Sequence, residues 1–175
     1  MTETSVLSQF PAADTLRNVP AMLRTMIGWM SAEQLQWRPA ADRWSVAMVL
    51  THLADVENRG FRRRVELIAS EDDPFLPSYD PWDYLRRIPV FDAHAALTQF
   101  AAERARTIAF LEATPASVLS RTGRHAELGP VTFEVYLNEL PFHDLGHVRQ
   151  ILEVYRCGAF YPKMGPYRDF YHVKP

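Results

Sequence analysis

The sequence predicts an all-α protein in which residues 1–175 form a single four-helix-bundle domain. Apolar side chains recur every three or four residues in four separate stretches, which is the spacing of one buried helical face. No stretch alternates apolar and polar residues convincingly in the way that a half-buried strand requires, and GPVTFEVYL is the one segment that could be mistaken for a strand. The length of 175 residues suits one ordinary domain, and 47% hydrophobic residues are enough to fill a sizeable core.

The first two expected helices lie on either side of the segment RPAADRWS. One spans residues 12–30 and carries a continuous apolar stripe. The other begins after Ser45, a residue type whose hydroxyl caps helix starts, and continues to about Ala69. Because the segment between them interrupts the apolar periodicity, we expect two separate helices.

A long loop is expected over residues 71–91. This segment contains four prolines, which remove backbone donors and prevent a long regular element: Pro74, Pro77, Pro81 and Pro89. The loop exceeds the usual length of a connection between helices, so it either crosses over the bundle or covers a site.

The third and fourth expected helices follow this loop. The third begins near Asp92, a good capping residue, and stops around the segment ATPAS. The fourth runs from about Thr132 to Arg156, and Gly158 ends it. Pro141 lies inside the fourth helix, so we expect a kink there or two helices placed end to end.

Composition excludes several classes of function. With 19 basic and 21 acidic side chains the formal charge is −2, so the chain lacks the positive surface that binds nucleic acid. No apolar run approaches the roughly 20 residues that span a membrane. The N-terminal residues MTETSVLSQF do not resemble a signal peptide, and the single cysteine, Cys157, cannot form an internal disulfide. These features predict a cytoplasmic protein.

Four arginines cluster in the second expected helix, at Arg59 and at residues 62–64. Such a cluster can bind an anionic ligand. Glu57 and Glu66 flank it, however, and this mixture of charges favours a solvated helix face.

His143 and His147 lie four residues apart in the fourth expected helix. Side chains at this spacing share one helical face with Cβ atoms about 5–6 Å apart, close enough for two imidazoles to bind one cation. His52 is the best third ligand, because it lies on the inward face of the second helix and a bundle brings facing helices together. Three buried imidazoles without a metal would each need a polar partner, so the pattern favours a metal site over three core histidines. The remaining histidines are expected at the surface or at helix ends: His94, His125 and His172.

The segment HDLGH differs from the metalloprotease motif H-E-x-x-H only at Asp144, which stands in place of glutamate. A shorter carboxylate would lie differently over a metal-bound water, and the chain shows neither the usual sheet nor a further downstream ligand. The sequence therefore does not predict a protease.

Two segments together resemble the DinB-like, or DinB/YfiT, superfamily: WSVAMVLTHLADVE, from Trp44, and HDLGHVRQI, from His143. Members carry a Trp-Ser pair at the start of the second helix, a histidine seven positions after the serine, and H-x-x-x-H on the last long helix. His52, His143 and His147 match these positions one for one. LGPVTFEVYL is also similar to the family's entry into its last helix, so the resemblance covers nearly the whole chain.

The resemblance implies an up-down-down-up bundle, in which the long loop is the crossover between the second and third helices, and commonly a homodimer. It implies a divalent metal, zinc or nickel, held by the three histidines with other positions open to water. Known relatives include transferases and isomerases that use a low-molecular-weight thiol such as bacillithiol, mycothiol or glutathione. The chain departs from many members at Phe142, the residue before His143, and it has Pro141 beside it. These differences affect the residues expected around the metal ligands more than the ligands themselves.

A cation held by three histidines with open positions can activate a bound water or thiol at neutral pH. This chemistry predicts that a metal-bound water or thiolate attacks a small electrophilic substrate, and together with the resemblance it implies a metal-dependent transferase, isomerase or hydrolase. Glu139, one turn before His143, is a candidate to orient a ring or relay a proton, and it is equally well explained as a solvated residue. Three weaker candidates for a supporting role are Asp55, Asp144 and Gln150.

Tyr79 and Trp82, in the proline-rich loop, are candidate substrate-binding residues. Aromatic residues in such loops more often anchor the loop to the core. Both interpretations remain open at this point.

The alternative to an enzyme is a non-catalytic metal-binding or stress-related module. A structural metal site usually fills its fourth position with a protein ligand, whereas a catalytic site keeps water there. The sequence offers no obvious fourth ligand, which favours catalysis. Three imidazoles suit zinc, nickel, copper or iron, so the sequence leaves the metal open, and it does not specify the substrate or the thiol.

Overall fold

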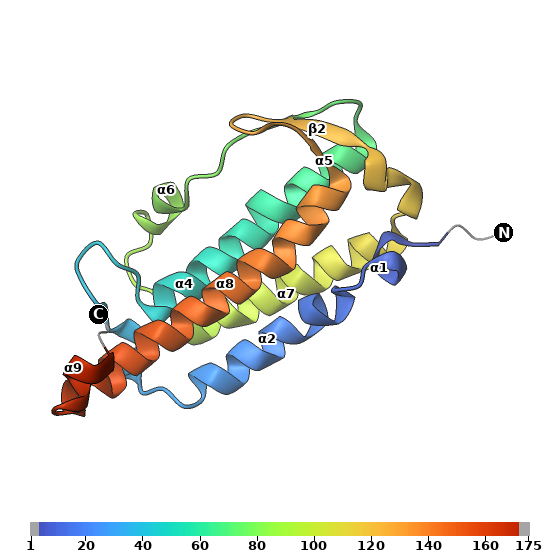
Figure 1. The fold of residues 1–175 in the computed structure, drawn as a ribbon. Helices are drawn as coiled ribbons and strands as arrows, with labels where there is room; N and C mark the ends of the chain where they lie inside the picture. The colour runs from blue at the N-terminus through green and yellow to red at the C-terminus, as the bar shows by residue number, and fades with distance from the viewer. Residues whose placement is uncertain (1–3, 172–175) are drawn as a thin grey trace.

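The computed structural model describes residues 4–171 and shows a bundle of four long helical segments (Figure 1). Their bounds are α2, Ala13–Ile27; a composite segment of α4, Val46–Asp55, η1, Val56–Arg62, and α5, Arg63–Ser70; α7, Ala93–Ala113; and α8, Phe133–Ala159. The composite segment and α7 run in one direction, and α2 and α8 run in the other (Figure 1). The predicted up-down-down-up four-helix bundle is therefore confirmed.

The connection from α5 to α7 returns the chain along the length of the bundle (Figure 1). It contains strand β1, Phe75–Leu76, and a short helix, α6, Pro81–Leu85. Asp80 caps α6 by accepting a hydrogen bond from the backbone N–H of Trp82 at 2.8 Å. Because this crossover brings the chain back to the end where α4 begins, α7 runs parallel to α4. The loop expected over residues 71–91 is thus the crossover.

The remaining helical elements are short: α1, Val6–Gln9; α3, Ala32–Gln36; η2, Ala116–Ser120; η3, Tyr161–Lys163; and α9, Tyr167–Tyr171. Three of the long elements start at side-chain caps. Ser45, Asp92 and Thr132 each accept a hydrogen bond from a backbone N–H in the first turn of α4, α7 and α8. No helix within the described residues is long and apolar enough to cross a membrane.

α8 is one continuous helix through Pro141, so the expectation of two helices end to end is wrong. Proline removes one hydrogen bond of the helical ladder. Here Leu140 and Pro141 are both buried in the core. Their buried apolar surface anchors this part of α8 to the core.

A small three-stranded sheet, which the sequence did not predict, covers one end of the all-α bundle. β2, Thr122–His125, pairs antiparallel with β3, Gly129–Thr132, and parallel with β1. The strands have only two to four residues, too few to show an alternating pattern. A Cβ atom at Gly123 would lie 2.9 Å from Leu76 Cδ1, so this glycine allows the strands to pack.

The apolar core consists of two clusters separated by polar residues. One cluster includes Leu50, Phe100 and Ile151, and the other includes Val65 and Phe133 and lies toward the sheet. Along the composite segment, α7 and α8, a group of buried polar residues lies between the two clusters: His52, Asp55, Glu57, Glu103, Arg104, Thr107 and Asp144. The bundle therefore contains a polar layer at mid-height.

Candidate metal centre

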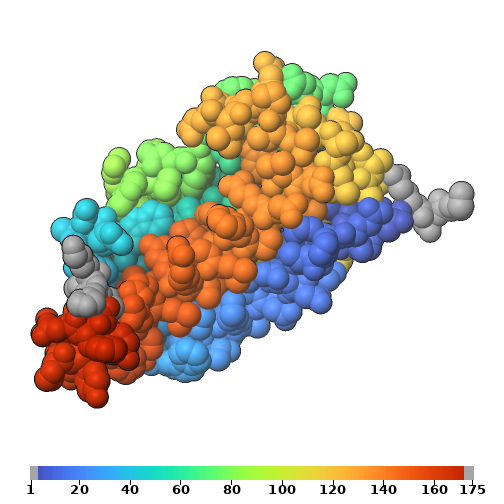
Figure 2. Space-filling view, viewed as in Figure 1, coloured from blue at the N-terminus to red at the C-terminus, as the bar shows by residue number. Residues whose placement is uncertain are grey.

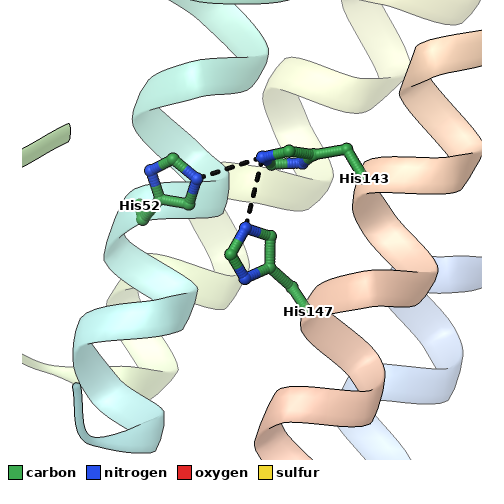
Figure 3. A group of neighbouring side chains, drawn as sticks. All are labelled: His52, His143 and His147. Carbon is green, nitrogen blue, oxygen red and sulfur yellow. Dashed lines mark hydrogen bonds between the residues drawn. The ribbon is translucent and has the colours of Figure 1, made fainter. Parts of the chain in front are cut away.

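Three imidazole rings converge between α4 and α8 within this polar layer (Figure 3). Nε2 of His143 lies 3.2 Å from Nε2 of His52 and 3.2 Å from Nε2 of His147. His52 comes from α4, and the other two come from successive turns of α8. The structure thus brings together the three histidines that the sequence singles out.

The spacing of these nitrogens fits a shared cation. Four-coordinate zinc binds imidazole nitrogen at about 2.0–2.1 Å, which places two nitrogens of a tetrahedral site about 3.3 Å apart. The three residues each offer a nitrogen within 4.8 Å of the others. Among residues 4–171 no other group of three His, Cys, Asp or Glu residues meets this criterion.

Burial keeps all three rings neutral. It lowers the pKa of His52 to about 2 and that of His143 to about 3, and the proximity of His147 adds to both shifts. Burial also lowers the pKa of His147, while a hydrogen bond to Gln150 opposes the shift. Because a metal binds the neutral form of imidazole, the site needs no deprotonation at pH 7.

The second nitrogen of each ring faces away from the cluster. Nδ1 of His147 lies 2.8 Å from Oε1 of Gln150, which fixes the ring with Nε2 toward the centre. Nδ1 of His52 and Nδ1 of His143 are buried and have no hydrogen-bond partner among the described residues. Gln150, a weak candidate on sequence grounds, is therefore the predicted supporting residue that contacts a histidine.

Aromatic side chains enclose the imidazoles. The ring centroid of Trp44 lies 5.0 Å from that of His52 and 6.2 Å from that of His147, with which it is stacked. Phe61 packs edge-on against His143 at 5.0 Å. Sequence reasoning missed Phe61, because its place in η1 gives no signal of proximity to α8.

Two clefts, of about 650 and 360 Å³, open onto the histidines. Trp44, Glu139, His143 and His147 line both of them. The larger cleft follows α8 as far as Cys157. A small molecule in either cleft can therefore reach the histidine cluster.

Glu139 lies one turn before His143 and faces both clefts. Partial burial raises the pKa of its carboxyl group, while Arg64 and His125 oppose the shift. His125, expected to have no role at the site, lines the smaller cleft. The third remaining histidine, His172, lies outside the described residues, and His94 is exposed as expected.

Asp55 belongs to a second network beside the histidines. It accepts hydrogen bonds from the hydroxyl of Tyr79 at 2.5 Å and from Arg59 at 2.5 and 2.6 Å. The Tyr79 ring lies 5.9 Å from the His52 ring, and burial raises the pKa of its hydroxyl. Trp82 packs edge-on against Trp44 at 5.6 Å, not against a histidine. These two loop aromatics therefore tie the crossover to α4 beside the site.

Asp144 makes no hydrogen bond to a histidine. Both of its oxygens accept hydrogen bonds from Arg104, on the side of α8 that faces the bundle interior. The position that holds glutamate in the metalloprotease motif is thus occupied by a structural ion pair.

The arginine cluster is not a fully solvated helix face. The side chain of Arg62 is 12% exposed and binds Glu103 at 2.6 Å. Arg64 is buried and donates a hydrogen bond to the carbonyl of Pro77. The interpretation as a solvated face fails because neighbouring segments supply acceptors that the local sequence does not reveal.

Comparison with known proteins places this geometry in a family. The model of the DinB superfamily matches residues 15–151. The chain belongs to the DinB superfamily. The matched range contains all three histidines and most residues of both core clusters.

Two individual proteins show the same relationship. The Oceanobacillus iheyensis protein named "Putative metal-dependent hydrolase OB0782" is 23% identical over 142 residues, which cover 78% of this chain and 79% of that protein. YfiT from Bacillus subtilis, described as a probable metal-dependent hydrolase with an unusual four-helix bundle topology, has a solved structure that matches with a TM-score of 0.74. That match has 24% sequence identity and covers 82% of this chain and 83% of YfiT, so it supports the fold.

Proposed function

We propose that His52, His143 and His147 bind one divalent cation, zinc or nickel, through their Nε2 atoms. The observation that carries this proposal is the convergence of three imidazoles, in which Nε2 of His143 lies 3.2 Å, close to the spacing of a tetrahedral site, from Nε2 of both His52 and His147. The family comparison supports it, because the names of the two relatives above describe one as a "putative" and the other as a "probable" metal-dependent hydrolase. A cation held only by these three residues has a coordination position left for water or substrate.

We further propose that the protein is an enzyme that acts on a small electrophilic substrate, with water or a low-molecular-weight thiol as the nucleophile. The bound cation would lower the pKa of that nucleophile. Glu139 would accept the released proton at its carboxylate, a role supported by its position in both clefts one turn from His143. Trp44 shields the imidazoles from bulk water, and Tyr79 lines the smaller cleft beside His52, where a substrate would bind. The names of the relatives favour water, and hence hydrolysis.

The test is metal analysis of protein purified without chelator. We expect about one zinc or nickel ion per chain, and loss of that ion in His147→Ala. His94→Ala is the matched control, because His94 is exposed at the start of α7 and lies outside the cluster. Equal metal content in wild type and His147→Ala would contradict the site.

Activity is tested on a panel of activated esters, with and without glutathione. A rate that disappears on chelation, returns with the metal and does not need glutathione supports hydrolysis. A rate that requires glutathione supports thiol transfer. If the metal-loaded protein does not turn over the esters either with or without glutathione, the non-catalytic metal-binding or stress-related module is the better description.

We also propose that the protein is a cytoplasmic homodimer. The outer face of α8 lies on the surface between α2 and the crossover, as Figure 2 shows. α8 exposes four large apolar side chains that a second copy could cover: Val135, Phe142, Leu145 and Leu152. Light scattering should give twice the chain mass, and Leu145→Lys should give the monomer mass.

A further inference from the structure

Arg104 is a fully buried charge at the centre of the bundle. Its side chain is 1% exposed, and all five of its N–H donors are used. Nε and Nη2 donate to Glu57 at 2.9 and 2.8 Å, and Nη1 and Nη2 donate to Asp144 at 2.6 and 3.0 Å. The fifth bond, from Nη1, goes to the backbone carbonyl of Leu16 at 3.2 Å.

These bonds join the four long segments of the bundle at one residue. Arg104 lies on α7, Glu57 on η1, Asp144 on α8 and Leu16 on α2. The carbonyl of Leu16 is free to accept because its usual helical donor four residues on would be the N–H of Pro20, which proline lacks. The guanidinium therefore fills a gap in the α2 ladder while it holds two carboxylates.

The two carboxylates belong to the same elements as the histidines. Asp144 directly follows His143, so a shift or rotation of α8 at Asp144 moves the His143 ring as well. Glu57 follows His52 by five residues in the same composite segment. His52 is thus connected to Arg104 through Glu57 and the composite segment. His143 and His147 are connected to it through Asp144 and α8.

A network of this kind is a poor source of stability. Buried ion pairs must recover a large desolvation cost, and well-packed apolar residues of similar volume are often as stable or more so. What apolar residues do not reproduce is the fixed fork geometry of a guanidinium bound to two carboxylates. We therefore expect Arg104 to determine the relative position of the helices more than the stability of the fold.

We propose that Arg104 is a positioning residue of the metal centre: it fixes the composite segment and α8 at the separation that sets the 3.2 Å distance between Nε2 of His52 and Nε2 of His143. The inference rests on the proposed function, because the consequence is expressed in metal binding. It assigns Arg104 a role at the site although it does not touch the histidines.

The test separates positioning from stability. In the triple variant Arg104→Leu, Glu57→Met and Asp144→Leu, the charges are removed together, so no unpaired charge is left in the core. We expect this variant to fold and to bind zinc about 10–100-fold more weakly than wild type, as in other changes to groups that orient metal ligands. We also expect altered visible bands in its cobalt-loaded form, because ligand geometry determines them. Arg104→Lys keeps the positive charge but not the fork geometry of the guanidinium, and it should show the same changes. This variant replaces the triple variant in the test if the triple variant does not fold.

Leu111→Ala is the control for lost stability. Leu111 lies seven residues after Arg104 on α7, is fully buried and belongs to the cluster toward the sheet. Its truncation should destabilise the fold while leaving zinc affinity and the cobalt spectrum of the folded protein unchanged. Wild-type affinity and spectrum in both Arg104 variants would overturn the proposal, as would an equal loss in Leu111→Ala.

A readout without metal distinguishes this proposal from the proposed function. In the metal-free protein, a nuclear Overhauser contact between the ring protons of His52 and His143 should be present in wild type and lost in the triple variant. If wild type binds no metal, the proposed function fails, and the persistence or loss of this contact still decides whether Arg104 positions the rings.

Discussion

His52 is an uncharged histidine in the folded protein over the whole range in which an exposed histidine titrates. Burial lowers its pKa from 6.5 to about 2, and His143 and His147 shift in the same direction. Between the folded and unfolded pKa values the unfolded chain binds more protons. The stability of the metal-free protein therefore rises with pH up to about 6.5 and falls as pH decreases below it.

We expect urea unfolding of the metal-free protein to show this slope between pH 6.5 and 5. Each depressed histidine contributes up to about 1.4 kcal/mol per pH unit once the unfolded ring is protonated. His52→Leu removes one titrating group and should lower the slope by about that amount. An identical slope in wild type and His52→Leu would show that His52 is not held neutral by the fold.

Gln150 acts on the site through a single hydrogen bond to Nδ1 of His147. Gln150→Leu removes the acceptor at similar volume and should weaken zinc binding by about 10-fold, because the ring loses the partner that orients it. Gln150→Glu keeps an acceptor and makes it anionic, so its affinity should equal or exceed that of wild type. Chelator competition measures both, and equal affinities for the two variants would assign the effect to packing.

At the scale of elements, two glycines of α8 make a matched pair. A Cβ atom at Gly158 would lie 2.7 and 2.8 Å from ring atoms of Trp37, whereas a Cβ atom at Gly146 meets nothing within 4 Å. Gly158→Ala should lower the free energy of unfolding by about 1–3 kcal/mol through overpacking. Gly146→Ala should raise it by up to about 1 kcal/mol, because alanine is the better helix former. Urea unfolding measures both, and a change of the same sign in both would contradict the packing at Trp37.

The helices could be predicted from sequence because each repeats its apolar spacing over several turns and starts at a capping residue such as Ser45 or Asp92. The strands could not, because Phe75–Leu76 and its neighbours are too short for a period, and their pairing joins distant parts of the chain. The π-helical turn of η1, Val56–Arg62, was also hidden. Its composition is that of an ordinary helix, so the sequence gives no sign of the π-helical hydrogen bonding that the folded chain adopts there.

Part of the candidate site could likewise be predicted from sequence, and part could not. His143, His147 and Gln150 lie within two turns of one helix, so their spacing alone placed them on one face. The pairing of Asp55 with Tyr79 depends on where the crossover lands, which local sequence does not determine. Arg104 gave a signal that sequence reasoning passed over. It stands four residues after Phe100 and seven before Leu111, so helical spacing places its charge on the inward face of the helix.

For the whole molecule, a cation in this site would join the second and fourth segments in the polar layer between the two apolar clusters. A ligand that binds only the folded state stabilises it by mass action, by about 2.7 kcal/mol at a free concentration 100 times its Kd. For a chain of this size that corresponds to a rise in Tm of roughly 5–10 °C. Thermal unfolding with increasing zinc should show this rise in wild type and in His94→Ala. It should be absent in His147→Ala, which keeps two of the three nitrogens but not the convergent set. A rise of the same size in His147→Ala would place the stabilising metal elsewhere on the protein.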